Sequence, residues 1–238
     1  MKKLRIAAVG TILTLGAAGV ATAQSSWPSV KVTPTVSPNK AGTKSHPQPV
    51  KLKTVFHWAE LGSSDQPIVT HFLVKFPKGS KYNGAHVTTC SVSKLNRKGP
   101  AGCPQASIMG KGSGTAYADT TETHPKITVV NGGATKVYFY TVLNNPARVQ
   151  EPVVGHITKA SGQWAYYLNV TVPQNLRIVA GVPIELTELS VSAGKGDWLE
   201  TTGCDHGKWP FSVTTDYLNP NTNATGSASY SAAVKCRS

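Results

Sequence analysis

The segment Ile68-Val-Thr-His-Phe-Leu-Val-Lys-Phe76 decides the fold class, and Pro77-Lys-Gly79 follows it directly. Most of its residues are β-branched or aromatic, which are the types enriched in strands. Proline and glycine rarely continue a strand, so they mark the point where it ends. The sequence therefore predicts a β-strand over residues 68–76.

The rest of the chain repeats this pattern of short β-rich blocks. Residues 50–58 alternate in part between polar and apolar types, as a half-buried strand does. Gly, Pro, Asn or Asp separate nearly all of the later blocks, which indicates turns between strands. These later blocks are residues 114–118, 126–130, 136–143, 153–158, 164–172, 184–192, 198–202, 211–217 and 227–234.

Helices have little support in the sequence. No long block keeps a helical apolar period with caps, and we expect only short helical turns near residues 91–96 and 104–108. Charged residues make up 15% of the chain, which is too few for the surface of a helical bundle or coiled coil. We therefore predict an all-β fold, an antiparallel β-sandwich of the jelly-roll kind, with residues 50–238 as one domain.

Residues 1–23 have the pattern of a cleaved signal peptide. Lys2, Lys3 and Arg5 precede an uncharged apolar stretch, and Ala21-Thr-Ala23 fits the small-residue cleavage pattern. The stretch is short for a membrane anchor, and no later stretch is apolar enough to span a bilayer. The sequence thus predicts a secreted, extracellular protein, and leaves association with the cell surface open.

Residues 24–49 form a Pro-rich segment before the predicted domain. Two interpretations stay open for it: an exposed linker, or an edge strand around residues 30–36, where proline is tolerated. The prolines of this segment are Pro28, Pro34, Pro38, Pro47 and Pro49.

Export to an oxidising compartment explains the even number of cysteines, because disulfides form there. Cys90, Cys103, Cys204 and Cys236 can pair in three ways. We expect Cys90–Cys103 and Cys204–Cys236, because each of these pairs closes a local loop. A metal site is disfavoured, since the chain has no Cys-x-x-Cys and only His206 lies near a cysteine in sequence.

The chain is strongly basic. Its formal net charge is +13 at pH 7, and +10 without the three cations of the signal peptide. A basic exported surface attracts anionic polymers, so the predicted partner is an anionic cell-wall polymer or polysaccharide. No run of four or more Lys and Arg exists, which argues against a nucleic-acid partner.

The most distinctive segment is residues 89–118, which combines Cys90, Cys103-Pro-x-x-Ser107 and glycines at 110, 112 and 114. A disulfide here would hold a small helical excursion between two strands, and the glycines would let the chain turn sharply back into the sheet. Together with Phe76-Pro-Lys-Gly79 and the two late cysteines, this pattern resembles a group of secreted actinobacterial proteins of unknown function. The resemblance covers most of the chain after the signal peptide, implies a β-sandwich and carries no established activity.

No catalytic or cofactor-binding motif stands out. Gly110-Lys-Gly-Ser-Gly114 lacks the spacing of a phosphate-binding loop, so we interpret it as a turn. Neither Ser107 nor Ser113 has the flanking glycines of a nucleophile elbow, and the seven histidines show no metal-ligand spacing. We therefore predict a protein that is not an enzyme and that has no catalytic residues, cofactor or metal.

Two groups of side chains keep other functions open. Glu185 with Glu200 or Asp216 could form the carboxylate pair of a glycan-active enzyme, if neighbouring strands bring them together. Exposed aromatic side chains could stack on a sugar, although most aromatic residues of this kind lie in the core. The candidate stacking residues are Trp164 and Tyr166, which would share a strand face, together with Trp198 and Trp209.

These observations predict a secreted, non-catalytic β-sandwich protein that binds the cell surface or a polymer. One alternative is a secreted jelly-roll enzyme that acts on glycans through paired acidic residues. A second alternative is a structural component of the cell surface.

Overall fold

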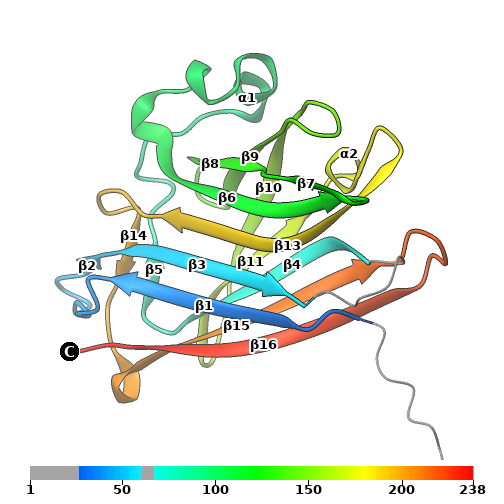
Figure 1. Ribbon diagram of the computed structural model, residues 1–238. Coiled ribbons are helices and arrows are strands. Elements are labelled where there is room, and N and C mark those ends of the chain that lie inside the picture. Colours follow the sequence, from blue (N-terminus) through cyan, green and yellow to red (C-terminus); the bar gives the residue numbers. More distant parts are fainter. Residues whose placement is uncertain (1–26, 60–66, 238) are drawn as a thin grey trace, which may run out of the picture.

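One antiparallel sheet dominates the computed structural model, which describes residues 27–59 and 67–237 (Figure 1). Strands make up 58% of it and helices 10%, which confirms the predicted all-β fold. The predicted signal peptide, residues 1–23, lies outside the described residues.

The main sheet has 13 strands, and its principal order is β1-β3-β13-β6-β8-β9-β10-β11-β4-β15-β16. In addition, β7 (Thr121–Thr123) pairs with β6, and β12 (Ile178–Val179) pairs with β13. The bounds of the other strands are β1 (Val30–Ser37), β3 (Lys51–Trp58), β4 (Ile68–Pro77), β6 (Ile108–Ala118), β8 (Lys126–Asn131), β9 (Lys136–Leu143), β10 (Val149–Lys159), β11 (Trp164–Thr171), β13 (Val182–Ala193), β15 (Lys208–Leu218) and β16 (Thr225–Lys235).

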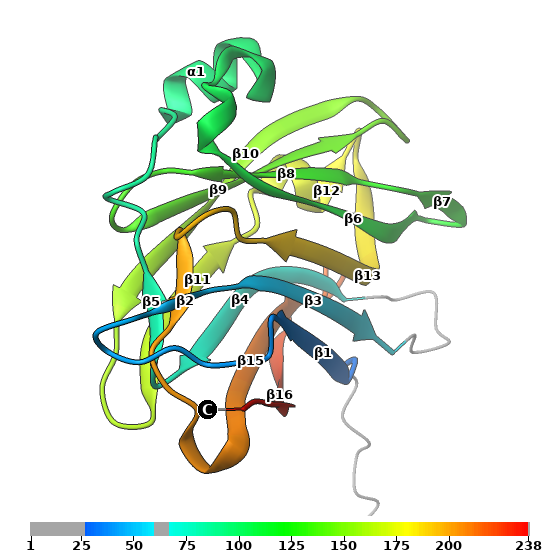
Figure 2. The same cartoon turned by 90° about the vertical axis from the view of Figure 1, so that its left-hand side faces the viewer.

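The sheet curls until its first and last strands meet. β1 and β16 lie side by side, so the sheet is nearly barrel-shaped (Figures 1 and 2). The inner faces of its two halves face each other, as in the predicted sandwich.

The alternation of side chains along each strand decides which residues lie inside. Along β15 the buried residues are Trp209, Phe211, Val213, Thr215 and Tyr217, and their neighbours are less buried.

Smaller elements cover the two ends of the curled sheet. A three-stranded sheet of β2 (Gln48–Pro49), β14 (Leu199–Thr201) and β5 (Ser80–Tyr82) lies across one end (Figure 2). The short helix α2 (Gln174–Arg177) packs against β4, β10 and β13 at the other end.

The predicted helical turns lie between β5 and β6. They are α1 (Val92–Lys98) and the 3₁₀ turns η1 (Pro100–Gly102) and η2 (Gln105–Ser107), and a further 3₁₀ turn, η3 (Asp205–Gly207), precedes β15. Ser91 begins α1, because its hydroxyl accepts a hydrogen bond from the backbone N–H of Lys94. Leu95 is fully buried and anchors the helix on the main sheet.

Both predicted disulfides are present. Cys90–Cys103 joins the two sides of the excursion that contains α1, with 5.5 Å between the Cα atoms. Cys204–Cys236 joins the chain after β14 to the chain after β16, with a Cα distance of 5.9 Å. Two disulfides are typical of extracellular proteins.

The glycines of residues 110–114 do not form the predicted turn. They lie inside β6, which begins at Ile108 rather than at residue 114. A Cβ atom at Gly110 would collide with the backbone oxygen of Ser192 on β13, and one at Gly112 would lie 2.6 Å from the backbone oxygen of Ser190. Glycine is thus required here because two strands approach closely within the sheet, and not because the chain turns.

The Pro-rich segment contributes a strand to the main sheet. β1 pairs with β3 along its whole length, from Val30 opposite Trp58 to Ser37 opposite Lys51. Pro34 lies within β1, where the missing N–H is tolerated because β1 ends the hydrogen-bonded order. The interpretation of residues 30–36 as an edge strand is therefore confirmed, and the sheet begins before residue 50, where we placed the start of the domain.

Candidate functional site

A cavity of about 280 Å³ lies between the two halves of the curled sheet. Apolar side chains from most of the long strands line it, among them Phe72, Phe139 and Leu168. Phe139 and Leu168 are only half-buried although they face the interior, because the cavity leaves part of their surface accessible. Small-molecule sites in proteins span about 300–1,000 Å³, so this cavity is close to the lower end of that range.

An apolar molecule in this space would bury its own surface and that of the lining side chains, and such burial is favourable by roughly 25 cal/mol per Å². The interior therefore has the lining and the volume of a binding site for an apolar molecule.

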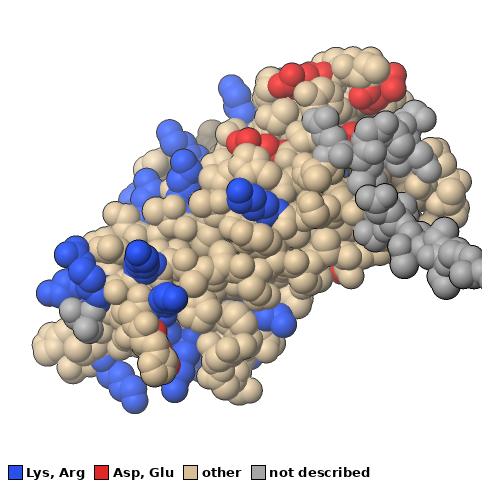
Figure 3. All heavy atoms as spheres, turned by 60° about the horizontal axis from the view of Figure 1, so that its bottom comes forward, with Lys and Arg blue, Asp and Glu red and all other residues tan. Residues whose placement is uncertain are grey.

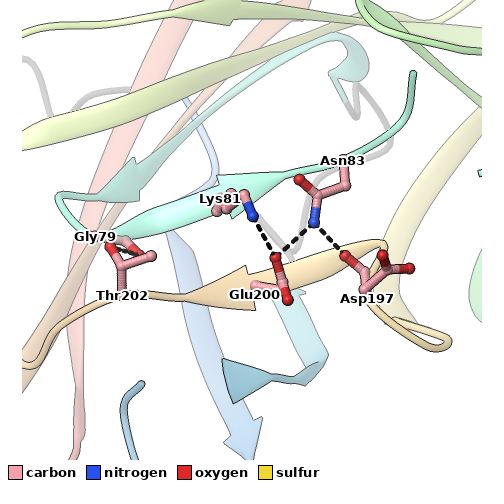
Figure 4. Close-up of polar contacts among 6 residues, drawn as sticks. All are labelled: Gly79, Lys81, Asn83, Asp197, Glu200 and Thr202. Atoms are coloured by element: carbon pink, nitrogen blue, oxygen red, sulfur yellow. Dashed lines mark hydrogen bonds and ion pairs between the residues drawn. The ribbon is translucent and has the colours of Figure 1, made fainter. Parts of the chain in front are cut away.

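Polar residues of β5 and β14 line one end of the cavity, and Figure 4 shows the contacts of Lys81 and Glu200 there. Lys81 Nζ lies 2.8 Å from Glu200 Oε2, and Asn83 Nδ2 donates to the same oxygen at 2.7 Å. Asn83 Nδ2 also donates to the backbone oxygen of Asp197 at 2.5 Å. One side-chain amide thus connects the carboxylate of β14 to the turn that precedes it.

Glu200 is the buried carboxylate of this end, with 8% of its surface exposed. Burial raises the pKa of its carboxyl group, but the hydrogen bonds from Lys81 and Asn83 and the charge of Lys81 together lower the pKa by more. The net result is a pKa below the ordinary value of 4.5, so Glu200 is charged at neutral pH. Thr202 fastens the same end, because its N–H and its hydroxyl donate to the backbone oxygen of Gly79 at 2.7 and 3.1 Å.

Glu200→Gln should reduce the stability of the fold at neutral pH and change how this stability depends on pH. A carboxyl group with a lowered pKa stabilises the fold above its ordinary pKa, and this contribution is lost as the pH falls. We expect the free energy of unfolding to be about 1–2 kcal/mol lower in the variant at pH 7, because charge-assisted hydrogen bonds are lost. The difference should shrink toward pH 3 in urea unfolding experiments at several pH values.

The matched control is Glu122→Gln, at an exposed carboxylate on β7. This variant should follow the wild-type pH profile. A stability difference for Glu200→Gln that stays constant from pH 7 to pH 3 would show that the pKa of Glu200 is not lowered.

Asn131 lies beside this polar end and is fully buried. Its Oδ1 accepts hydrogen bonds from Trp198 Nε1 at 3.1 Å and from the Tyr82 hydroxyl at 3.2 Å. Burial raises the pKa of Tyr82, so this hydroxyl remains a donor. The side-chain nitrogen of Asn131 lies 2.9, 3.0 and 3.1 Å from the backbone oxygens of Gly84, Val87 and Thr88. One amide thus joins β8 to β5, to the loop after β5 and to Trp198, which directly precedes β14.

Acidic side chains lie mostly toward one end of the strands, whereas Lys and Arg occur at both ends and are more numerous at the other. We call the end of the main sheet where β3 and β15 begin the basic end, and the opposite end the acidic end. Figure 3 shows Lys and Arg toward one end of the visible face and most of its Asp and Glu toward the other. The basic end carries Lys40, Lys51, Lys53, Lys111, Lys208, Lys235 and Arg237, and the acidic end carries Asp119, Glu122, Glu151, Glu185, Glu188 and Asp216. Asp197, Glu200 and Asp205 are the acids near the basic end.

Cations of the basic end are close neighbours. Lys208 lies directly opposite Lys235 on β15 and β16. The backbones of Lys40 and Arg237 form an isolated parallel β-bridge, so these two residues are also neighbours. All four are exposed, and within residues 27–59 and 67–237 only one Lys or Arg, Lys81, forms an ion pair. Like charges opposite each other destabilise a sheet, so the Lys208–Lys235 pair does not contribute to folding.

The four candidate stacking residues do not form an exposed platform. Trp198 and Trp209 are in the core, with 3% and 1% of their surface exposed, so the prediction of an exposed stacking surface is wrong for both, although both line the interior cavity. Tyr166 lines the cavity, and a register shift separates it from Trp164. This shift interrupts the alternation from which we predicted a shared face. The large area of each aromatic ring explains why burial prevails.

The candidate carboxylate pairs are not brought together on neighbouring strands. Glu200 lies at the basic end, whereas Glu185 lies at the acidic end. Asp216 is on β15, which does not neighbour β13, and its Oδ2 lies 2.9 Å from Nδ1 of His71. In the described part of the chain, no group of three or more His, Cys, Asp and Glu could hold a metal ion.

Sequence reasoning missed three residues of the cavity ends. Lys81 and Asn83 flank Tyr82 directly after the Pro77-Lys-Gly79 turn, and this spacing was the only signal that they share a face. Arg177, the last residue of α2, also lines the cavity and follows a Pro-Gln-Asn-Leu stretch with no recognisable motif.

Comparison of the chain with models of protein families, with curated proteins and with solved structures gives no match in any of the three. Among the described residues, no helix is long and apolar enough to cross a membrane. The site must therefore be interpreted from its own geometry.

Proposed function

We propose that the protein is an exported, non-catalytic binding protein whose basic end binds an anionic cell-wall polymer. The observation that carries the proposal is the row of unpaired cations at one end of the strands, with Lys208 opposite Lys235. An anionic polymer would relieve the repulsion within this pair, because its repeated negative charges can contact several cations at once. The predicted signal peptide and the two disulfides support export.

The proposal predicts binding that depends on salt and on the position of the charges. The protein should bind beads coated with polygalacturonate, an acidic polysaccharide, and should not bind beads of neutral dextran. Binding should weaken steeply between about 0.05 and 0.5 M NaCl, because salt screens exposed charges. Lys208→Gln with Lys235→Gln should reduce the affinity at low salt roughly three- to tenfold.

The matched control is Lys31→Gln with Lys126→Gln. It removes the same two charges from exposed positions outside the basic end, on β1 and β8. This control should bind nearly as well as the wild-type protein. Equal loss in both double variants would mean that net charge and not the basic end drives binding, and full binding in 1 M NaCl would exclude the charge-driven interaction altogether.

A further inference from the structure

The interior cavity extends along the strands. On β4 alone, residues from Val69 to Pro77 line it, and at about 3.3 Å per residue this run spans about 25 Å. The lining is almost wholly apolar over this length, so the space suits the extended chain of an aliphatic molecule.

One charged side chain lines this apolar space without a partner. Arg177 ends α2 and lines the cavity at the acidic end of the sheet. Its Nε atom is fully buried and has no hydrogen-bond partner, and its guanidinium forms no ion pair with any other described residue. A buried guanidinium N–H of this kind is costly unless an acceptor, above all a carboxylate, binds it.

At the opposite end of the cavity the charged side chains of the lining already bind each other. The hydroxyl oxygen of Thr201 is also buried there without a partner, but a hydroxyl brings no charge. Glu200 lines the same end, is charged at neutral pH and has already bound Lys81. Lys81 also lines this end, but its charge is already matched by Glu200, so Arg177 is the cation of the lining that has no anionic partner among the described residues.

We propose that the cavity binds a linear aliphatic carboxylic acid, with its chain between the two halves of the sheet and its carboxylate on Arg177. Apolar burial along the chain supplies most of the affinity, and the guanidinium supplies the preference for an acid. This second binding activity goes beyond the proposed function, because it uses the interior and the acidic end of the sheet rather than the basic end.

Isothermal titration calorimetry with decanoate and with 1-decanol tests the proposal, because the two probes share a chain and differ in the head group. The wild-type protein should bind decanoate at least about tenfold more tightly than decanol. Arg177→Gln should weaken decanoate binding about tenfold and leave decanol binding unchanged. Arg148→Gln, at an arginine that does not line the cavity, should leave both unchanged.

A second variant tests where the aliphatic chain of the ligand lies. Val74→Phe should abolish binding of both probes without lowering the unfolding temperature, because a larger side chain fills the cavity. If this variant does not fold, Leu168→Phe replaces it. Failure of the wild-type protein to bind decanoate, equal affinity for both probes, or weakening by Thr201→Val but not by Arg177→Gln would each overturn the proposal. Polymer binding by the basic end should be the same in Arg177→Gln, so the two proposals fail separately.

Discussion

Replacing both Cys204 and Cys236 by alanine should lower the free energy of unfolding by about 4 kcal/mol. The bond joins residues that are 32 positions apart, and a cross-link of this span removes that much conformational freedom from the unfolded chain. Cys236 is also buried, beside Trp209 and Phe211, so its loss disturbs packing at the basic end. Equilibrium unfolding in guanidinium chloride without reductant measures the change.

The Cys90–Cys103 pair is the internal comparison. Its residues are 13 positions apart, so alanine at both positions should cost about 3 kcal/mol, less than the loss of the longer link. The opposite ranking of the two variants would contradict the explanation by loop length. It would indicate instead that contacts around α1 determine the stability of the fold.

Asn131→Ala should be as destabilising as the loss of a disulfide, by about 3–5 kcal/mol. The substitution leaves Trp198 Nε1 and the backbone oxygens of Gly84, Val87 and Thr88 without the amide that now binds them. Each buried polar group without a partner costs about 1–3 kcal/mol, and the loop after β5 loses its main connection to β8. Urea unfolding followed by tryptophan fluorescence reports both stability and the environment of Trp198.

Asn175→Ala is the control for this substitution. Asn175 is exposed on α2 and its side chain donates to Glu151 Oε2 at 2.8 Å, so its loss should change stability by no more than about 0.5 kcal/mol. A loss below about 1 kcal/mol for Asn131→Ala would mean that water replaces the lost hydrogen bonds. The buried amide would then have no special role in the fold.

The strands and disulfides could be predicted because their signals are local. Alternation along β15 and the short separation of Cys90 and Cys103 are visible in the chain itself. The start of β6 was not predictable, since glycine weakens an isolated strand and only the close approach of β13 explains Gly110 and Gly112. The Pro-rich segment left two interpretations open, because only its pairing with β3, a long-range contact, distinguishes an edge strand from a linker.

The candidate site was less predictable, because long-range contacts build it. Lys81 and Glu200 are 119 positions apart in the chain, and no local pattern connects them. Alternation shows that Trp209 and Phe211 share a face, but it does not tell which face of the sheet is inside. Six of the eleven acids lie within residues 184–217, but their position relative to the strands depends on antiparallel register, which the sequence does not show.

The opposite charge of the two ends gives the molecule an electric dipole along its strands. Near a negatively charged boundary such a dipole experiences a torque, which turns the cationic pole toward the boundary before contact. Arg177 and α2 would then point away from the boundary and into the surrounding fluid. The molecule would reach the boundary already oriented. Its basic end would bind there, while the end with Arg177 would stay accessible to a ligand in the surrounding fluid.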